Sequence, residues 1–494
     1  FGSRLRGLGQ CPEMTDFIVA PVSEGSIESI QSIQSEADPK GQALGKGHTG
    51  HTYWEFSKAF LKLTWPLLLG NTLEWYEFGI YSYVEKEIAA NFFGGSAMGA
   101  WLGYAVTFVA RPLGGIILGF IGDHCGRKLA VNLSLAGMVF ATVGQGLLPG
   151  AHLGKNFQVL GLVLLICLRA VQGISAGGEI AAIAAYMMEV SPMQTLGMAV
   201  CMISVGSQIA WAFASALMAL LNSCLGPELM LTWGWRVPFL LSALPGAIAM
   251  WGRNRIQESE VFIDEVESDT KSVCSVGELV RNHPGSLLVG IGAVAATATM
   301  WFSPPFWTLS ALMSDLGAAD ALWVGNSCQL VGLAVTPLAG LLADYFGVAW
   351  VQLVGALYCA LVSFPAYIWL SFDNSRLAAY LGLGVIFGVA QGFNGASVYL
   401  FCAELFPPKL RCQGMALSYN LGVSFLGGFS ASISQALLEV SYHFGPGIYW
   451  SATGVATSCT ILVALLLQRK GWMTLTHRRS APYFGRLKGV RPSA

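Results

Sequence analysis

The chain alternates between long apolar runs and short polar stretches, and most runs reach about 20 residues. A helix needs about 20 apolar residues to cross a hydrocarbon core about 30 Å thick, whereas the strands of a membrane barrel would give alternating segments of about ten residues. The pattern therefore predicts an all-α membrane protein with about twelve transmembrane helices. The predicted spans are 59–83, 97–121, 129–149, 158–186, 196–221, 236–252, 286–312, 321–343, 348–371, 377–402, 414–438 and 448–468.

Polar stretches divide the chain into five predicted parts. These are a polar, disordered N-terminal tail (1–57), a first six-helix bundle (58–252), a central loop (253–285), a second six-helix bundle (286–468) and a basic tail (469–494). Because the number of spans is even, both tails and the central loop are expected on the same side of the membrane.

The composition agrees with this class. Hydrophobic residues make up 54% and charged residues 11% of the chain, whereas soluble domains carry about 25% charged residues. A net charge of -1 gives no reason to expect a nucleic-acid partner. The 11 cysteines are scattered and the seven histidines lack metal-ligand spacing, so we expect no disulfide framework, metal site or cofactor.

The positions of Lys and Arg predict the orientation. Basic residues of cytoplasmic loops outnumber those of the opposite side, and the distribution fits if both termini are cytoplasmic. The inner segments then hold Arg127, Lys128, Arg253, Arg255, Lys271, Arg281, Lys409, Arg411 and the basic tail, and the outer loops hold Lys86, Lys155 and Arg376. The plasma membrane is the expected location.

The two halves of the chain repeat one another in sequence. The matching pairs occur in the same order, 215 to 221 residues apart, and are Gly119-x3-Asp123-x2-Gly126 with Gly340-x3-Asp344-x2-Gly347, Gln172-Gly173 with Gln391-Gly392, Glu189-x2-Pro192 with Glu404-x2-Pro407, and Gly197-Met198-Ala199 with Gly414-Met415-Ala416. A repeat of six helices preserves the topology, which predicts two pseudo-symmetric bundles related by an axis along the membrane normal.

Charged residues inside apolar spans are the strongest functional candidates. They are Glu74, Glu77, Arg111, Arg169 and Glu179. A charge at mid-bilayer costs about 2.5 to 3.5 kcal/mol on insertion scales, so these side chains are expected to face one another or a wet cavity between the bundles. Two interpretations remain open, namely a solute and proton pathway, or buried ion pairs that fix helix registry. We favour the pathway for Glu77 and Arg111, with Glu77 as the proton carrier.

One loop stands out between the second and third predicted spans. It reads Gly119-Phe-Ile-Gly-Asp123-His-Cys-Gly126-Arg127-Lys128. Its glycines permit a tight turn and close helix approach, and Asp123 with the basic pair can latch neighbouring helices. Together with Asp344, Glu189, Glu404 and Arg411, these residues form the predicted gating motif.

This loop resembles the hallmark loop of the major facilitator superfamily. Three further motifs, Gly70-Asn71-x2-Glu74-Trp75-Tyr76-Glu77-Phe78-Gly79, Arg111-Pro112-Leu113-Gly114-Gly115 and Gln172-Gly173-Ile-Ser-Ala-Gly177-Gly178-Glu179, resemble its metabolite:proton symporter branch. That branch includes proline/betaine, α-ketoglutarate, citrate and shikimate transporters. The resemblance covers about residues 60 to 470. It implies a twelve-helix fold of two bundles, proton-coupled symport and alternating access.

Three positions depart from the pattern of that branch. Glu77 stands where Asp is usual, Val348-Ala349 stand where basic residues are expected, and Glu260 replaces a proline. The second departure predicts a weak or absent latch in the second half.

The predicted function is proton-coupled symport of a small zwitterion or organic acid, with proline/betaine-like solutes ahead of dicarboxylates. Arg111 is the predicted partner of a solute carboxylate. An uncoupled facilitator for the same solutes and a non-transporting receptor are the alternatives. No nucleophile-base arrangement and no P-loop motif occurs, so neither an enzyme nor an ATP-driven pump is expected. The expected partners are the solute, protons and lipid, and a monomer is compatible with the sequence.

Overall fold

The computed structural model describes residues 53–191, 195–256, 258, 276–303, 318–373 and 375–470. Within these ranges all regular structure is helical. Residues 1–52 and 471–494 of the predicted tails and most of the central loop, including Lys271 and Glu260, lie outside the described residues, whereas residues 53–57 of the predicted N-terminal tail belong to the first helix.

The helices of the first half form one group. They are α2 (Tyr53–Tyr83), α3 (Glu85–Phe92), α4 (Ala97–His124), α5 (Arg127–Gly146), α6 (Lys155–Val190), α7 (Leu196–Leu229), α8 (Arg236–Leu241) and α9 (Ala243–Arg253). Short 3-10 and π-helical segments occur at Ala151–Leu153 and Met230–Gly234.

The second half forms the other group. Its helices are α11 (Val276–Asn282), α12 (Pro284–Phe302), α14 (Ala318–Phe346), α15 (Val348–Phe372), α16 (Arg376–Ala378), α17 (Phe387–Glu404), α18 (Arg411–Gly422), α19 (Ser430–Val440) and α20 (Gly445–Arg469). Two π-helical segments, Ala379–Ile386 and Val423–Gly427, join α16 to α17 and follow α18, and a 3-10 turn spans Pro408–Leu410.

Ten helical stretches of the described chain are long and apolar enough to cross a membrane. The remaining two predicted spans correspond to α2, which carries Asn71, Glu74 and Glu77 along its length, and to α8 with α9, which meet at Ser242 and are each too short to span alone. The described helices therefore account for the twelve predicted spans, and the all-α membrane fold is confirmed.

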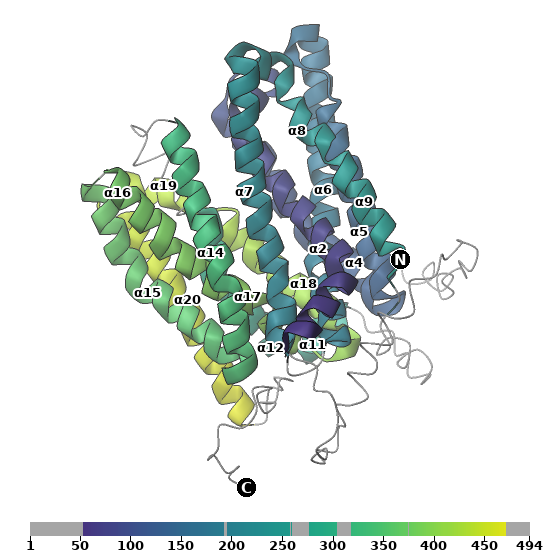
Figure 1. Ribbon diagram of the computed structural model, residues 1–494, viewed down its shortest axis with the longest axis vertical. Helices are drawn as coiled ribbons and strands as arrows, with labels where there is room; N and C mark the ends of the chain where they lie inside the picture. Colours follow the sequence, from purple (N-terminus) through teal and green to yellow (C-terminus); the bar gives the residue numbers. More distant parts are fainter. Residues whose placement is uncertain are drawn as a thin grey trace.

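The two groups stand side by side and meet along two seams. Figure 1 shows the first group on the right and the second on the left, with their ribbons close together at the lower end and farther apart at the upper end. The seams between the groups are α4 against α18 and α7 against α14. We call the lower end, where α4 turns into α5 and α14 into α15, the turn end.

Both turns at this end use a glycine in the left-handed region of backbone space. Gly126 has φ of 108° and Gly347 has φ of 95°, a conformation that glycine adopts without steric penalty. Each glycine directly precedes the first residue of the next helix. The repeated Gly-x3-Asp-x2-Gly pattern thus forms the same turn in both halves.

Candidate functional site

The carboxylate of Asp123 closes one seam at the turn end. It accepts hydrogen bonds from the backbone N–H groups of Cys412 (3.1 Å) and Gln413 (2.9 Å), at the start of α18 in the other group. The first N–H groups of a helix lack partners within it, and its positive dipole end favours an anion. A side chain of one group therefore caps a helix of the other.

Asp344 makes the equivalent contact at the second seam. Its carboxylate accepts from the N–H groups of Gly197 and Met198 (3.0 Å for the latter), at the start of α7. The sequence led us to expect a weak or absent second latch, because Val348 and Ala349 replace basic residues. The structure corrects this expectation, since the capping contact needs only the carboxylate and exposed N–H groups, and not the basic pair.

Charged side chains reinforce the first latch. Arg127 contacts Glu189 at 3.0 Å and donates to the Pro408 carbonyl at 3.1 Å, and Arg411 approaches the same Glu189 oxygen at 3.4 Å. Glu189 thus binds arginines from both groups.

Three predicted gating residues remain, of which Gly119 lies against Gln413 of α18. Lys128 donates to the carbonyl of Asn254. Glu404 is buried at the end of α17.

The buried pair of Glu179 and Arg253 is fully bonded within the first group. Arg253 forms an ion pair with Glu179 and also donates to the carbonyls of Pro66, Leu67 and Val131. These bonds join α2, α5, α6 and α9. The sequence placed Arg253 at the start of the central loop, but it is the last residue of α9 and is buried. We therefore interpret this pair as structural, because its bonds hold four helices of the first group together.

Glu77 belongs to a second buried network. The Gln172 amide donates to the Glu77 carboxylate, while the Gln172 carbonyl oxygen accepts from Arg169 at 2.7 Å. The Arg169 guanidinium lies over the rings of Tyr81 (4.1 Å) and Tyr104 (5.3 Å). No salt bridge to Glu77 occurs among the described residues. Because an amide N–H can donate to a carboxylate or to the carbonyl oxygen of a carboxylic acid, Gln172 can bond to Glu77 in either protonation state.

The third network crosses between the groups. Arg111 forms an ion pair with Glu74 (2.6 Å) and donates through Nε to Asn420 of α18 (3.2 Å). Asn420 also donates to the carbonyl of Gly177 on α6. Glu74 and Arg111 are fully buried, yet Glu74 Oε2 and Arg111 Nη1 have no hydrogen-bond partner in the described part of the chain. The pair is therefore only half satisfied.

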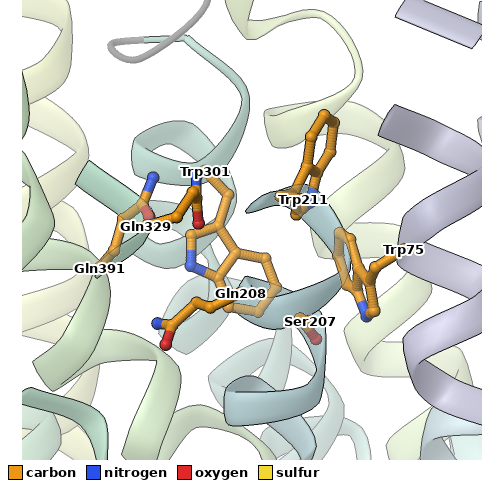
Figure 2. Close-up of a pocket in the computed structure, with 7 residues that line it drawn as sticks. All are labelled: Trp75, Ser207, Gln208, Trp211, Trp301, Gln329 and Gln391. Atoms are coloured by element: carbon orange, nitrogen blue, oxygen red, sulfur yellow. The ribbon is translucent and has the colours of Figure 1, made fainter. Parts of the chain in front are cut away.

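A pocket lies between the two groups and is lined by indole rings and amides. Its lining residues are Trp75, Ser207, Gln208, Trp211, Trp301, Gln329 and Gln391, which come from α2, α7, α12, α14 and α17 (Figure 2). Its cavity volume is about 20 Å³, close to the space that one ordered water needs, so the pocket is narrow in this structure. None of these lining residues carries a formal charge.

Aromatic rings join the two groups beside the pocket. The rings of Trp75 and Trp301 meet edge to face at 5.0 Å, and Phe108 and Phe302 do so at 5.3 Å. Trp301 also lies 6.1 Å from Tyr399. The pocket is therefore bordered by side chains that must separate if the two groups move apart.

The sequence-predicted residues fall into these networks as follows. Glu74 and Arg111 contact each other, whereas Arg169 and Glu179 each bind a different partner, and none of the five predicted pathway residues lines the pocket. The lining glutamines were not recognised from the sequence, because neutral side chains in an apolar span carry no distinctive signal. Asn420 was missed for the same reason.

Two helical groups that close on each other through capped helix ends, with a polar pocket between them at the seams, define a multi-pass membrane transporter. The comparisons with known proteins identify its family. The family model of the major facilitator superfamily matches residues 67–432, and the chain belongs to this superfamily. It is a transporter and not an enzyme.

Curated relatives cover most of the chain. It is 31% identical over 393 residues to the ectoine/proline transporter of Corynebacterium glutamicum, covering 75% of this chain and 77% of that protein. It is 27% identical to the glycine betaine/proline/ectoine/pipecolic acid transporter of Dickeya dadantii (77% and 78% covered) and 26% identical to the proline/betaine transporter of Escherichia coli (80% and 81% covered).

Solved structures share the fold. A structure of the proton:xylose symporter XylE bound to 6-bromo-6-deoxy-D-glucose superposes with a TM-score of 0.65 at 17% identity, covering 85% of this chain and 98% of that one. The inward-open xylose transporter XylE from E. coli gives a TM-score of 0.60 at 15% identity, with 82% and 95% covered. At this identity the likeness establishes the fold alone.

Proposed function

We propose that this transporter carries a small zwitterion of the proline/betaine kind together with a proton. The observation that carries the proposal is the uncharged pocket of three indoles and three amides between the bundles. Indole faces attract an ammonium group through the ring quadrupole, and amide N–H groups bind a carboxylate without adding a full charge. Together they suit a molecule that carries both charges.

The same pocket argues against dicarboxylates and other organic acids as first substrates. A net anion in a buried site needs a cationic partner, and no Lys or Arg lines the described pocket. Arg111, which the sequence suggested for this role, is fully buried and bonded to Glu74 and Asn420. The relatives named above are described as transporters of proline, glycine betaine, ectoine and pipecolic acid. These names also support zwitterions ahead of dicarboxylates as substrates.

Glu77 is the proposed proton carrier. It is buried on α2, two residues from Trp75, and Gln172 can bond to it with or without a proton. Alternating access then follows from separating the latches at the turn end, which we place on the cytoplasmic side of the plasma membrane because of the distribution of basic residues. The two domains of the transporter are proposed to be residues 58–252 and 286–468, with both termini cytoplasmic.

Replacing Trp301 by leucine tests the pocket. We expect the KM for betaine uptake to rise about tenfold, because a cation over an indole contributes about 0.5 to 2 kcal/mol. Trp323→Leu is the matched control, since Trp323 is an exposed indole on α14 outside the pocket. Uptake competition by betaine, proline, citrate and α-ketoglutarate is measured in parallel. Equal KM values for both variants, or stronger competition by the dicarboxylates, would reject the proposed site.

A further inference from the structure

The two seams between the bundles differ in charge. Two turns before Asp344 on α14, Thr336 accepts a hydrogen bond from Gln208 of α7 (3.0 Å). This bond across the α7–α14 seam joins neutral side chains. The α4–α18 seam contains the Glu74–Arg111 ion pair, which meets α18 at Asn420. Away from the capping carboxylates Asp123 and Asp344, the α4–α18 seam therefore contains a buried ion pair at a place where the α7–α14 seam has a bond between neutral side chains.

The Glu74–Arg111 pair differs from the buried Glu179–Arg253 pair. Arg253 and Glu179 have no unbonded side-chain atom among the described residues, whereas Glu74 Oε2 and Arg111 Nη1 lack partners there. A half-satisfied buried pair is a poor way to stabilise a fold, because its desolvation is not fully compensated. This arrangement favours a functional role for the pair.

Neutralising Glu74 would leave Arg111 as a buried cation without a counter-charge. Removing one partner from a buried ion pair is strongly unfavourable, because the remaining charge stays out of water. Separation of α18 from α4 would uncover Arg111 and let water solvate it. Loss of the Glu74 charge therefore shifts the equilibrium toward an open turn end.

The chain around α18 allows such a movement. The polar contacts between α18 and the first bundle lie at its two ends. At one end its backbone N–H groups bond to Asp123 and Arg411 contacts Glu189. At the other end are Asn420 and the following Ser424, which donates to the Phe108 carbonyl (2.7 Å). The π-helical segment Val423–Gly427 then separates α18 from α19, and such segments are frequent at functional sites.

We propose that Glu74, Arg111 and Asn420 form a charge lock on the α4–α18 seam, which opens when a proton neutralises Glu74. Asn420 is the positioning residue that holds α18 against the pair. This inference rests on the proposed proton-coupled symport, but its test does not use transport. The ionisable groups that face the pair are Glu77 on α2, Tyr104 on α4, Glu179 on α6, Arg253 on α9, Tyr399 on α17 and Tyr419 on α18.

Cys412 is a built-in reporter of the seam. It is fully buried, and its sulfur packs against Gly122 of α4. In a chain whose other cysteines are replaced, alkylation by N-ethylmaleimide should report how often α18 leaves α4. We expect Glu74→Gln to raise the labelling rate about tenfold or more. Because N-ethylmaleimide reacts with the thiolate, each rate is divided by the rate of the unfolded chain at the same pH. On this scale, lowering the pH should raise labelling in the unsubstituted protein and in Glu77→Gln, and not in Glu74→Gln.

A charge moved across the seam makes the test specific. In the double variant Glu74→Gln/Asn420→Asp, the carboxylate lies on α18 within reach of Arg111 Nε, so the ion pair itself now joins the two bundles. We expect labelling to fall toward the unsubstituted rate, although the substitution also removes the amide that donates to the Gly177 carbonyl. Glu74→Gln/Asn222→Asp is the control, because Asn222 lies at an exposed position of α7 and donates to its own helix.

The outcomes separate the two proposals. Rapid labelling in Glu74→Gln that Asn420→Asp reverses and Asn222→Asp does not would support the lock. Slow labelling of Glu74→Gln, or equal rates in both double variants, would overturn it. If Glu74→Gln does not fold, the unsubstituted protein provides the test. Labelling of Cys412 that rises as the pH is lowered would support the lock, and labelling that does not change with pH would overturn it. Failure of proton-driven uptake would instead reject the proposed function and leave these labelling results standing.

Discussion

Replacing Glu77 by glutamine is expected to abolish proton-driven accumulation of the solute while leaving solute exchange intact. Glutamine preserves the size of the side chain and its bond to Gln172, but it cannot gain and lose a proton. One positive charge moved through 100 mV supplies about 2.3 kcal/mol, or roughly 50-fold accumulation, and the variant should fall to a ratio of about one.

Counterflow provides the control for this variant. Proteoliposomes loaded with unlabelled betaine should exchange it for labelled betaine at a rate close to that of the unsubstituted protein, because exchange needs solute binding and reorientation but no net proton movement. Accumulation that survives in Glu77→Gln would exclude Glu77 as the carrier. Loss of exchange as well would indicate a defect in folding or binding.

Replacing Glu179 by glutamine is expected to destabilise the first bundle strongly. The change leaves Arg253 as an unpaired cation among α2, α5, α6 and α9, and breaking a buried pair from one side lowers the free energy of unfolding by about 3 to 5 kcal/mol. That is a large part of the 5 to 15 kcal/mol of a typical domain. The midpoint of heat-induced loss of monodisperse protein in detergent should fall accordingly.

Glu228→Gln serves as the matched control for this stability measurement. Glu228 lies at an exposed position near the end of α7, so the same chemical change there should leave the midpoint unchanged. A midpoint for Glu179→Gln equal to that of the control would show that the pair does not pin the bundle, and would restore a pathway role for Glu179 as the better interpretation.

The sequence predicted the helices well because membrane spans are set by a single physical length. The bounds of α15, Val348–Phe372, differ by one residue from the predicted span 348–371. The repeat of Gly-x3-Asp-x2-Gly likewise predicted matching turns, since a left-handed glycine is encoded locally; the helices that Asp123 and Asp344 cap are distant in the chain. Local chemistry of this kind can be read without knowing the partner.

Partners distant in the chain could not be predicted. Arg253 was interpreted as a marker of the cytoplasmic side, and only its position at the end of α9 shows that it reaches Glu179, 74 residues away in sequence. Arg111 and Asn420 are 309 residues apart. The pocket glutamines are polar residues in apolar helices, and which of them face the pocket depends on how the bundles pack.

Accumulation of radiolabelled betaine in proteoliposomes with an imposed pH gradient, acidic outside, tests the account most directly. The account predicts uptake well above the external concentration, collapse of that uptake when a protonophore is added, and no comparable accumulation of citrate or α-ketoglutarate. Uptake that only equilibrates with the medium and is indifferent to the protonophore would contradict proton coupling. Absence of any zwitterion flux would contradict the assignment of the pocket.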